Sequence, residues 1–303
     1  MNKSGNDTWM EAKKEFESFL KIEKSLSENS IEAYMHDVTL LEKFSESELT
    51  SKAPGQVSFD DIKAFIVWLN IDNPRTQSRI LSGIRSFFRY MVIEGKIEEN
   101  PATLIESPRI GRILPEVLSE EEIDSIIASI DLSKSEGQRN RAIIETLYGC
   151  GLRVSELINL RLTDLHFKEE YILVTGKGDK QRLVPLNDAV IREINKYFED
   201  RNSLKIISDN NILFLNRRGR RLTREMIYTI IKNLAYQAGI RKKVSPHTFR
   251  HSFATHLIKK GADLRAVQEM LGHESILTTE IYTHIDRLYL KRTIDMHHPR
   301  SGK

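Results

Sequence analysis

The alternation of apolar and polar residues predicts helices over most of the chain. After Ser27, a good N-cap residue, Ile31, Tyr34, Val38 and Leu41 recur at helical spacing. A longer helix is predicted over Pro74–Glu94, with a proline at its start and its apolar residues within one arc of about 120°. These apolar residues are Ile80, Leu81, Ile84, Phe87, Phe88 and Met91.

The pattern then changes. Residues 106–115 contain two prolines and a glycine without periodicity, which indicates a linker. Ser119 and the acidic residues after it predict a new helix start. Two runs of β-forming residues flank Gly176–Lys180 and predict a hairpin with Lys177 in its turn. Further helices are predicted over Asp188–Phe198, Thr223–Gln237, His247–Lys260, Leu264–Leu271 and Leu277–Ile285.

These elements predict a mainly α protein with a small antiparallel sheet. We expect a helical N-terminal domain at residues 1–105, a linker at 106–115 and an α+β domain at 116–303. The 303-residue chain is 40% hydrophobic and 29% charged, and it has no apolar run long enough for a membrane span. Met1–Glu15 lacks the apolar core of a signal peptide, and a single cysteine, Cys150, fits a reducing compartment. The sequence therefore predicts a cytoplasmic protein without a membrane partner.

The basic residues are unevenly distributed. Residues 1–105 contain 13 basic and 17 acidic residues, whereas residues 106–303 contain 33 and 26. An excess of positive charge in the second part is expected if that part binds phosphates. From the counts alone, a solubilising excess is the simpler interpretation.

Two groups of arginines are candidates for DNA contacts. On the helix over Pro74–Glu94, the face opposite the apolar arc carries four arginines and no acid, so a phosphate-facing surface and a solvated arginine face are equally good interpretations. Its members are Arg75, Arg79, Arg85 and Arg89. The second group, which also fits a solvated loop, is Arg217, Arg218, Arg220, Arg221 and Arg224.

Three fragments carry candidate chemistry. In the first, two glycines before Arg153 indicate a helix that ends tightly and holds this arginine in a fixed place. In the second, Ser245-Pro246 starts a helix whose first turn puts His247 and Arg250 on one face, beside backbone N–H groups that favour an anion. His247 and His251 have the spacing of a zinc pair, but no glutamate follows His247 and no further ligands complete a metal site.

The third fragment contains Leu271-Gly272-His273 and, shortly afterwards, Tyr282. A single tyrosine in an amphipathic helix is usually a packing residue. Its companions along the chain change that interpretation.

The fragments together resemble the tyrosine site-specific recombinases. The resemblance is carried by Gly151–Glu156, Lys177 in the hairpin, His247-x-x-Arg250, Leu271–His273 and Tyr282, which occur in the order and spacing of that family. Ser245–His273, Tyr282–His284 and His298–Arg300 resemble the bacterial Xer recombinases in particular. The resemblance covers nearly the whole chain, and none of the six functional positions departs from it.

The resemblance implies a mechanism. Tyr282 would attack the DNA phosphate, form a 3′-phosphotyrosyl link and release a 5′-hydroxyl without ATP. Arg153, Arg250 and His273 would stabilise the transition state, His247 would assist phosphate binding and proton transfer, and Lys177 would be the general acid. Glu156 would orient its neighbours. Because the arginines supply the positive charge, no metal or other cofactor is expected.

The resemblance also implies partners. A SAM-like N-terminal domain and the catalytic domain would clamp double-stranded DNA at a specific recombination site. Four protomers would form the synapse, each docking the tail after Tyr282 on its neighbour through apolar residues that include Leu288, Leu290, Ile294 and Met296. Whether the other protomers come from a paralogue, and whether a DNA translocase activates them, stays open.

The expected role is the resolution of chromosome or plasmid dimers, which the compact length favours. The alternatives are an integrase or transposase of a mobile element, a type IB topoisomerase and a catalytically silent DNA-binding protein.

Overall fold

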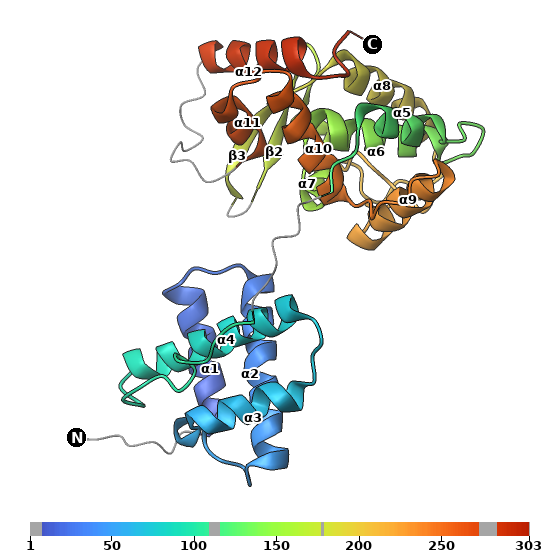
Figure 1. Ribbon diagram of the computed structural model, residues 1–303. Coiled ribbons are helices and arrows are strands. Elements are labelled where there is room, and N and C mark those ends of the chain that lie inside the picture. Colours follow the sequence, from blue (N-terminus) through green and yellow to red (C-terminus); the bar gives the residue numbers. More distant parts are fainter. Residues whose placement is uncertain (1–7, 109–115, 177–178, 273–283, 303) are drawn as a thin grey trace. The chain divides into compact units, whose positions relative to one another are not determined.

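The chain forms two compact units, Met1–Ile113 and Leu114–Lys303, in the computed structural model (Figure 1). The structure describes residues 8–108, 116–176, 179–272 and 284–302. Most of the predicted linker, residues 109–115, lies outside the described residues.

The first unit is helical. It contains α1 (Trp9–Ile22), α2 (Glu28–Glu48), a 3₁₀ turn at Pro54–Gln56, α3 (Phe59–Leu69) and α4 (Pro74–Ile93). α2 packs against both α1 and α4. The six apolar residues predicted for the inner face of α4 are all exposed by 2% or less, so this prediction is confirmed. Their burial against the aromatic residues of α1 and α2 supplies the core of the unit.

The second unit consists of a small sheet and the helices that pack around it. Its elements are α5 (Glu120–Ala128), α6 (Gly137–Cys150), α7 (Val154–Asn159), a 3₁₀ turn at Leu162–Asp164, β1 (Leu165–His166), β2 (Tyr171–Thr175), β3 (Gln181–Pro185), α8 (Asp188–Asn202), α9 (Arg224–Gln237), α10 (Pro246–Lys259), α11 (Leu264–Leu271) and α12 (His284–His297). The strands are antiparallel in the order β1-β2-β3. The mainly helical fold with a small antiparallel sheet and the β2–β3 hairpin are therefore confirmed.

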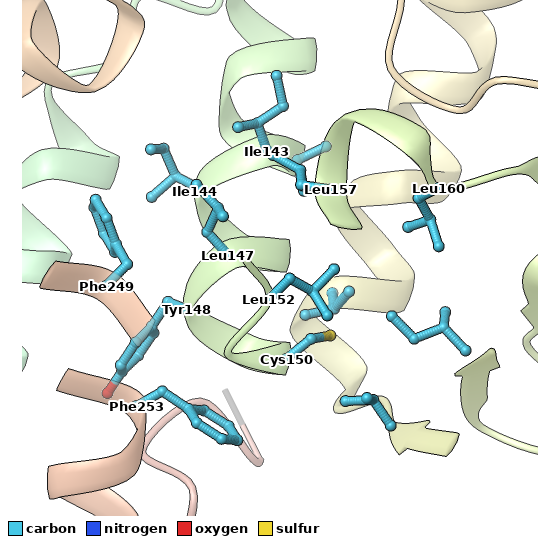
Figure 2. Close-up of a cluster of buried hydrophobic side chains, with 14 of the residues drawn as sticks. Ile143, Ile144, Leu147, Tyr148, Cys150, Leu152, Leu157, Leu160, Phe249 and Phe253 are labelled. Atoms are coloured by element: carbon cyan, nitrogen blue, oxygen red, sulfur yellow. The ribbon is translucent and has the colours of Figure 1, made fainter. Parts of the chain in front are cut away.

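Helix α6 is the centre of this unit. Every residue from Ala142 to Cys150 is buried, so the helix has no solvent face along its second half. Figure 2 shows its side chains packed against Phe249 and Phe253 of α10 and against Leu157 of α7. The helix that precedes Arg153 is consequently a rigid support.

Two further helix predictions have different outcomes. The start at Ser119 is confirmed, because its side chain accepts a hydrogen bond from the N–H of Glu122 and the Glu122 side chain accepts one from Ser119. Most of the predicted helix Leu277–Ile285 lies outside the described residues. Among the described helices, none has the length and apolar character needed to cross a bilayer.

Candidate active site

The junction between α6 and α7 positions Arg153. α6 ends at Gly151, which has a φ of 59°, and a Cβ there would lie 2.5 Å from the Phe253 ring. Glycine is therefore needed both for the left-handed conformation and for the close approach of α10. Arg153 is the N-cap residue of α7, directly after the buried Leu152. The prediction of a tight helix end is confirmed.

The first turn of α10 positions Arg250 and His247. The Ser245 side chain accepts a hydrogen bond from the N–H of Thr248, and Pro246 occupies the first turn. Arg250 points inward and is 8% exposed, while His247 is exposed. Arg250 Nη1 donates to the Gly151 carbonyl at 2.8 Å and Nη2 donates to the Leu271 carbonyl at 2.6 Å. Arg250 thus joins the α6–α7 junction to the end of α11.

Glu156 is the anion around which the arginines gather. Its Oε2 accepts from the Arg153 backbone N–H at 2.8 Å, and its Oε1 accepts from Arg153 Nη1 at 2.8 Å. Arg250 Nη1 lies 4.0 Å from Oε2. Burial alone would raise the pKa of Glu156, but the hydrogen bonds and charge of Arg182 and the hydrogen bonds of Arg153 outweigh burial and lower it. Glu156 therefore stays ionised and compensates the positive charge around it.

Arg182 belongs to this cluster and was missed in the sequence. It lies on β3 and donates Nη1 and Nη2 to the two carboxylate oxygens of Glu156, both at 2.8 Å. A signal was available, because Arg182 alternates with Val184 and Leu186 and so falls on the inner face of its strand. A charged residue on an inner face needs a buried partner, and that partner is Glu156.

The cluster keeps a surplus of positive charge. The guanidinium groups of Arg153, Arg182 and Arg250 surround one carboxylate. Burial and the charge of Arg153 lower the pKa of Arg250 to about 10, which still leaves it protonated at neutral pH. A guanidinium carries five N–H donors, and the hydrogen bonds to Glu156, Gly272, Gly151 and Leu271 use two on each of Arg153 and Arg250. Donors and charge therefore remain for a phosphate.

The other predicted catalytic residues, Lys177, His273 and Tyr282, lie outside the described residues. Their neighbours in the chain are described. Gly176, before Lys177, donates its N–H to the Lys180 carbonyl at 2.8 Å. Gly272, before His273, accepts from Arg153 Nη2 at 3.2 Å.

The arginines of α4 do not form a uniform free face. Arg79 makes a two-bond ion pair with Asp37 of α2, at 2.7 and 2.8 Å, and the Asp37 side chain is fully buried. Burial raises the pKa of Asp37 against the opposing effect of Arg79. Arg85 donates to the carbonyls of Ala102 and Ile105 and to a serine hydroxyl, and so holds the segment after α4.

These partners place Arg79 and Arg85 in the packing of the unit, and the prediction that the four arginines face phosphate stays a prediction. Arg75 and Arg89 are exposed, and neither has a side-chain partner among the described contacts.

Four of the five arginines in the second group line a surface hollow. Its cavity of about 610 Å³ is lined in part by Arg218, Arg220, Arg221 and Arg224, together with Asp209. Arg221 donates Nη1 to Asn159 at 3.0 Å. Arg217 is exposed and does not line the hollow. These four arginines line a concave surface, but two acids, Asp209 and Glu225, share it.

The tail is docked on its own catalytic unit. α12 packs against β3, α10 and α11, and Leu290 and Ile294 are exposed by 1% or less. Leu288 and Met296 are 47% and 69% exposed. Within the single chain, Leu290 and Ile294 therefore fill the core of their own unit, and the docking of the tail on a neighbouring protomer stays a prediction.

No group of three or more His, Cys, Asp or Glu side chains suited to a metal occurs among the described residues, which include His247 and His251.

Comparison with known proteins agrees with this architecture. Residues 116–288 match the Phage integrase family, and residues 14–95 match the phage integrase N-terminal SAM-like domain. A tyrosine recombinase XerD of Listeria innocua is 40% identical over 291 residues, which cover 95% of this chain and 98% of the relative. The XerD of Oceanobacillus iheyensis is 42% identical over 293 residues, with the same coverage of both chains.

Solved structures give the same result. The XerH recombinase bound to a palindromic difH substrate is 26% identical, with a TM-score of 0.68 over 94% of this chain and 84% of the other. A lambda integrase dimer bound to a core site has a TM-score of 0.69 at 17% identity, covers 89% of this chain and 96% of its own, and supports the fold alone.

Proposed function

The chain belongs to the Phage integrase family as a Xer-type tyrosine recombinase, and from that premise we propose how its residues divide the work of cutting and rejoining DNA. Tyr282 is the nucleophile. Its phenolic oxygen forms a bond to the phosphorus while the bond to the 5′ oxygen breaks, so the phosphodiester energy is kept in a 3′-phosphotyrosyl link. The 5′-hydroxyl of a partner strand reverses the step and rejoins the DNA.

Lys177 gives the proton that the departing 5′ oxygen needs, and His247 assists proton transfer at the phosphate. His273 donates a hydrogen bond to a phosphate oxygen. These assignments rest on the family motifs that the sequence carries at the same positions.

The observation that carries the proposal is the arginine cluster around Glu156. The transition state at phosphorus concentrates negative charge on its equatorial oxygens, and fixed donors stabilise it without reorganisation. Arg153 and Arg250 come from different helices, α7 and α10, yet both are tied to the α6–α7 junction and to the end of α11. Planar guanidinium groups held in this way suit a phosphate.

The DNA is double-stranded and is cut at one specific site by several protomers acting together. We propose that the cellular role is the resolution of chromosome or plasmid dimers in the cytoplasm, a role consistent with relatives of about 40% identity that are named tyrosine recombinase XerD. The participation of a paralogous protomer and activation by a DNA translocase are further parts of the proposal.

The experiment is covalent trapping. In the cell that makes the protein, tagged protein is recovered after rapid denaturation, and the DNA attached to it is sequenced. If the trapped DNA comes from a single chromosomal site, the result supports dimer resolution. If it comes from the junctions of a mobile element, the role is integration.

Tyr282→Phe removes only the attacking oxygen and is the matched control. It is expected to give no covalent DNA on a denaturing gel while retaining duplex binding. Covalent product with the mutant would contradict the assignment of Tyr282.

A further inference from the structure

Arg182 is the most enclosed arginine near the candidate site. It is 5% exposed and stands opposite the buried Val174 in the β2–β3 register. Both Nη atoms donate to Glu156, and Nε donates to the Met270 carbonyl at 2.7 Å. All three nitrogens are thus engaged inside the protein, so Arg182 is suited to hold other groups and not to contact DNA.

Two glycines bring the backbone close to this guanidinium. A Cβ on Gly272 would lie 2.9 Å from Arg182 Cδ, closer than side chains approach, and 3.3 Å from Cζ, which is a tight contact. A Cβ on Gly176 would lie 3.8 Å from Arg182 Nη1 and 3.9 Å from Glu156 Oε1. In the chain, Gly272 directly precedes His273 and Gly176 directly precedes Lys177. Arg182 therefore lies where the backbones leading to these two residues converge.

We propose that Arg182 is a positioning residue that fixes the spacing of three parts of the active site. These parts are the hairpin that carries Lys177, the end of α11 that leads to His273, and the Arg153–Glu156 pair. The inference rests on the proposed function, because it takes those residues as the catalytic set.

A purely stabilising role accounts less well for this arrangement. A buried ion pair is a weak source of stability, since desolvation offsets its attraction, and packed apolar residues serve that purpose as well. What the Arg182 fork provides is geometry: two parallel bonds to Glu156 and a third bond to α11, in one plane. Glu156 passes this geometry to Arg153 through two further bonds.

The test is Arg182→Lys, which keeps the charge and loses the fork. The matched control is Arg201→Lys. Arg201 is 3% exposed on α8 and donates to the carbonyls of Asn210, Ile212 and Leu213, so it is an equally buried arginine whose described hydrogen bonds all go to another segment. The substrate is a duplex with the sequence recovered by covalent trapping. It carries a nick, and the nick captures the cleaved intermediate.

Misplacing catalytic groups by about 1 Å costs on the order of 100-fold in rate. We expect Arg182→Lys to slow single-turnover cleavage by about that factor while half-site binding stays unchanged. Arg201→Lys is expected to cleave at the wild-type rate, even if its melting temperature falls as much as that of Arg182→Lys.

A second readout separates positioning from general stability. If Arg182 acts through Glu156, the double variant Arg182→Lys/Glu156→Gln is no slower than the slower single variant, because the two residues work as one unit. Wild-type cleavage by Arg182→Lys, an equal loss in Arg201→Lys, or losses that multiply in the double variant would each overturn the inference.

If Arg182→Lys does not fold, Gly272→Ala decides the question. Its Cβ would press on the Arg182 side chain, and Gly239→Ala is its control, because Gly239 has a φ of 71° with no atom within 4 Å of the Cβ position. Loss of cleavage in Gly272→Ala alone supports the inference, and equal cleavage by both variants refutes it. Wild-type protein that forms no covalent DNA complex would instead reject the proposed function, a result that the same gel distinguishes.

Discussion

The end of the tail should hold the tail on the catalytic unit, and Arg300→Met tests this. We call these docked residues, His298–Arg300, the latch. Arg300 Nε donates to Glu145 Oε2 at 3.0 Å, Nη2 donates to Glu145 Oε1, and Nη1 donates to Asp124 at 2.7 Å. Glu145 lies on α6 and is fully buried. Burial would lower the pKa of Arg300, but the bonds and charge of Glu145 outweigh burial and raise it.

The neighbouring histidine is also fixed. His298 Nδ1 accepts from the backbone N–H of Arg300 at 3.1 Å, so the proton lies on Nε2, which faces the Tyr148 carbonyl at 3.3 Å. Burial lowers the pKa of His298 to about 3, so it is neutral whenever the latch is closed. The last residues therefore dock on α6 through paired and hydrogen-bonded groups.

Arg300→Met leaves the Glu145 carboxylate buried without its partner. Breaking a buried pair from one side costs about 3–5 kcal/mol. In a domain of this size each kcal/mol lowers the melting temperature by about 2–4 °C, so a fall of roughly 6–20 °C is expected. Scanning calorimetry measures it, and the N-terminal unit, which has a core of its own, serves as an internal reference.

Two variants sharpen the test. Adding Glu145→Leu to Arg300→Met removes the unpaired charge and should restore most of the lost stability. Met296→Ala, at a position that is 69% exposed, should change stability by less than about 0.5 kcal/mol. If Arg300→Met has the same melting temperature as Met296→Ala and wild type, the latch does not hold the tail on α6.

Four further predictions concern the catalysis and the arginines. Lys177→Ala should cleave a 5′-bridging phosphorothiolate nearly normally, because sulfur leaves without a proton; an equal defect on both substrates would exclude the general-acid role. Cleavage should persist in excess chelator, and activity restored only by Mg²⁺ would contradict the charge compensation proposed here. Because the folded pKa of Glu156 is lowered, its contribution is present above about pH 4.5 and lost on acidification. The stability advantage of wild type over Glu156→Gln should therefore shrink in acid, and a constant difference in calorimetry would refute this. Arg79→Ala should destabilise the N-terminal unit by about 1–3 kcal/mol through the orphaned Asp37, whereas Arg89→Ala should leave stability intact and reduce the salt dependence of DNA binding by about one ion; the reverse pattern would contradict both assignments.

Local patterns were sufficient to predict much of the fold. The inner face of α4 follows from periodicity alone, and the starts of α5 and α10 follow from serine caps and their first turns. The end of α6 at Gly151 was also readable, because a glycine before a new helix marks a left-handed cap. These features depend on residues only a few positions apart.

The electrostatic partners were not predictable from such patterns. Arg79 was interpreted as an exposed arginine, and its partner Asp37 lies on another helix. Glu156 binds Arg182 from a strand 26 positions further along, and Arg300 reaches back to Glu145. Each pair follows from the tertiary packing, and a one-dimensional pattern of charges does not show which of them will be buried together.

The docked tail changes how one protomer can influence another. Moving α12 to a neighbour requires exposing Leu290 and Ile294, at about 1.5–3 kcal/mol each, and opening the Arg300–Glu145 pair. A neighbouring protomer must therefore offer an equivalent pocket and an equivalent acid. The exposed Leu288 and Met296 carry no such cost. Because α12 begins at His284, directly after the segment that contains Tyr282, we expect a contact on these two residues to act on Tyr282, the proposed nucleophile, through the covalent chain while the latch holds the other end.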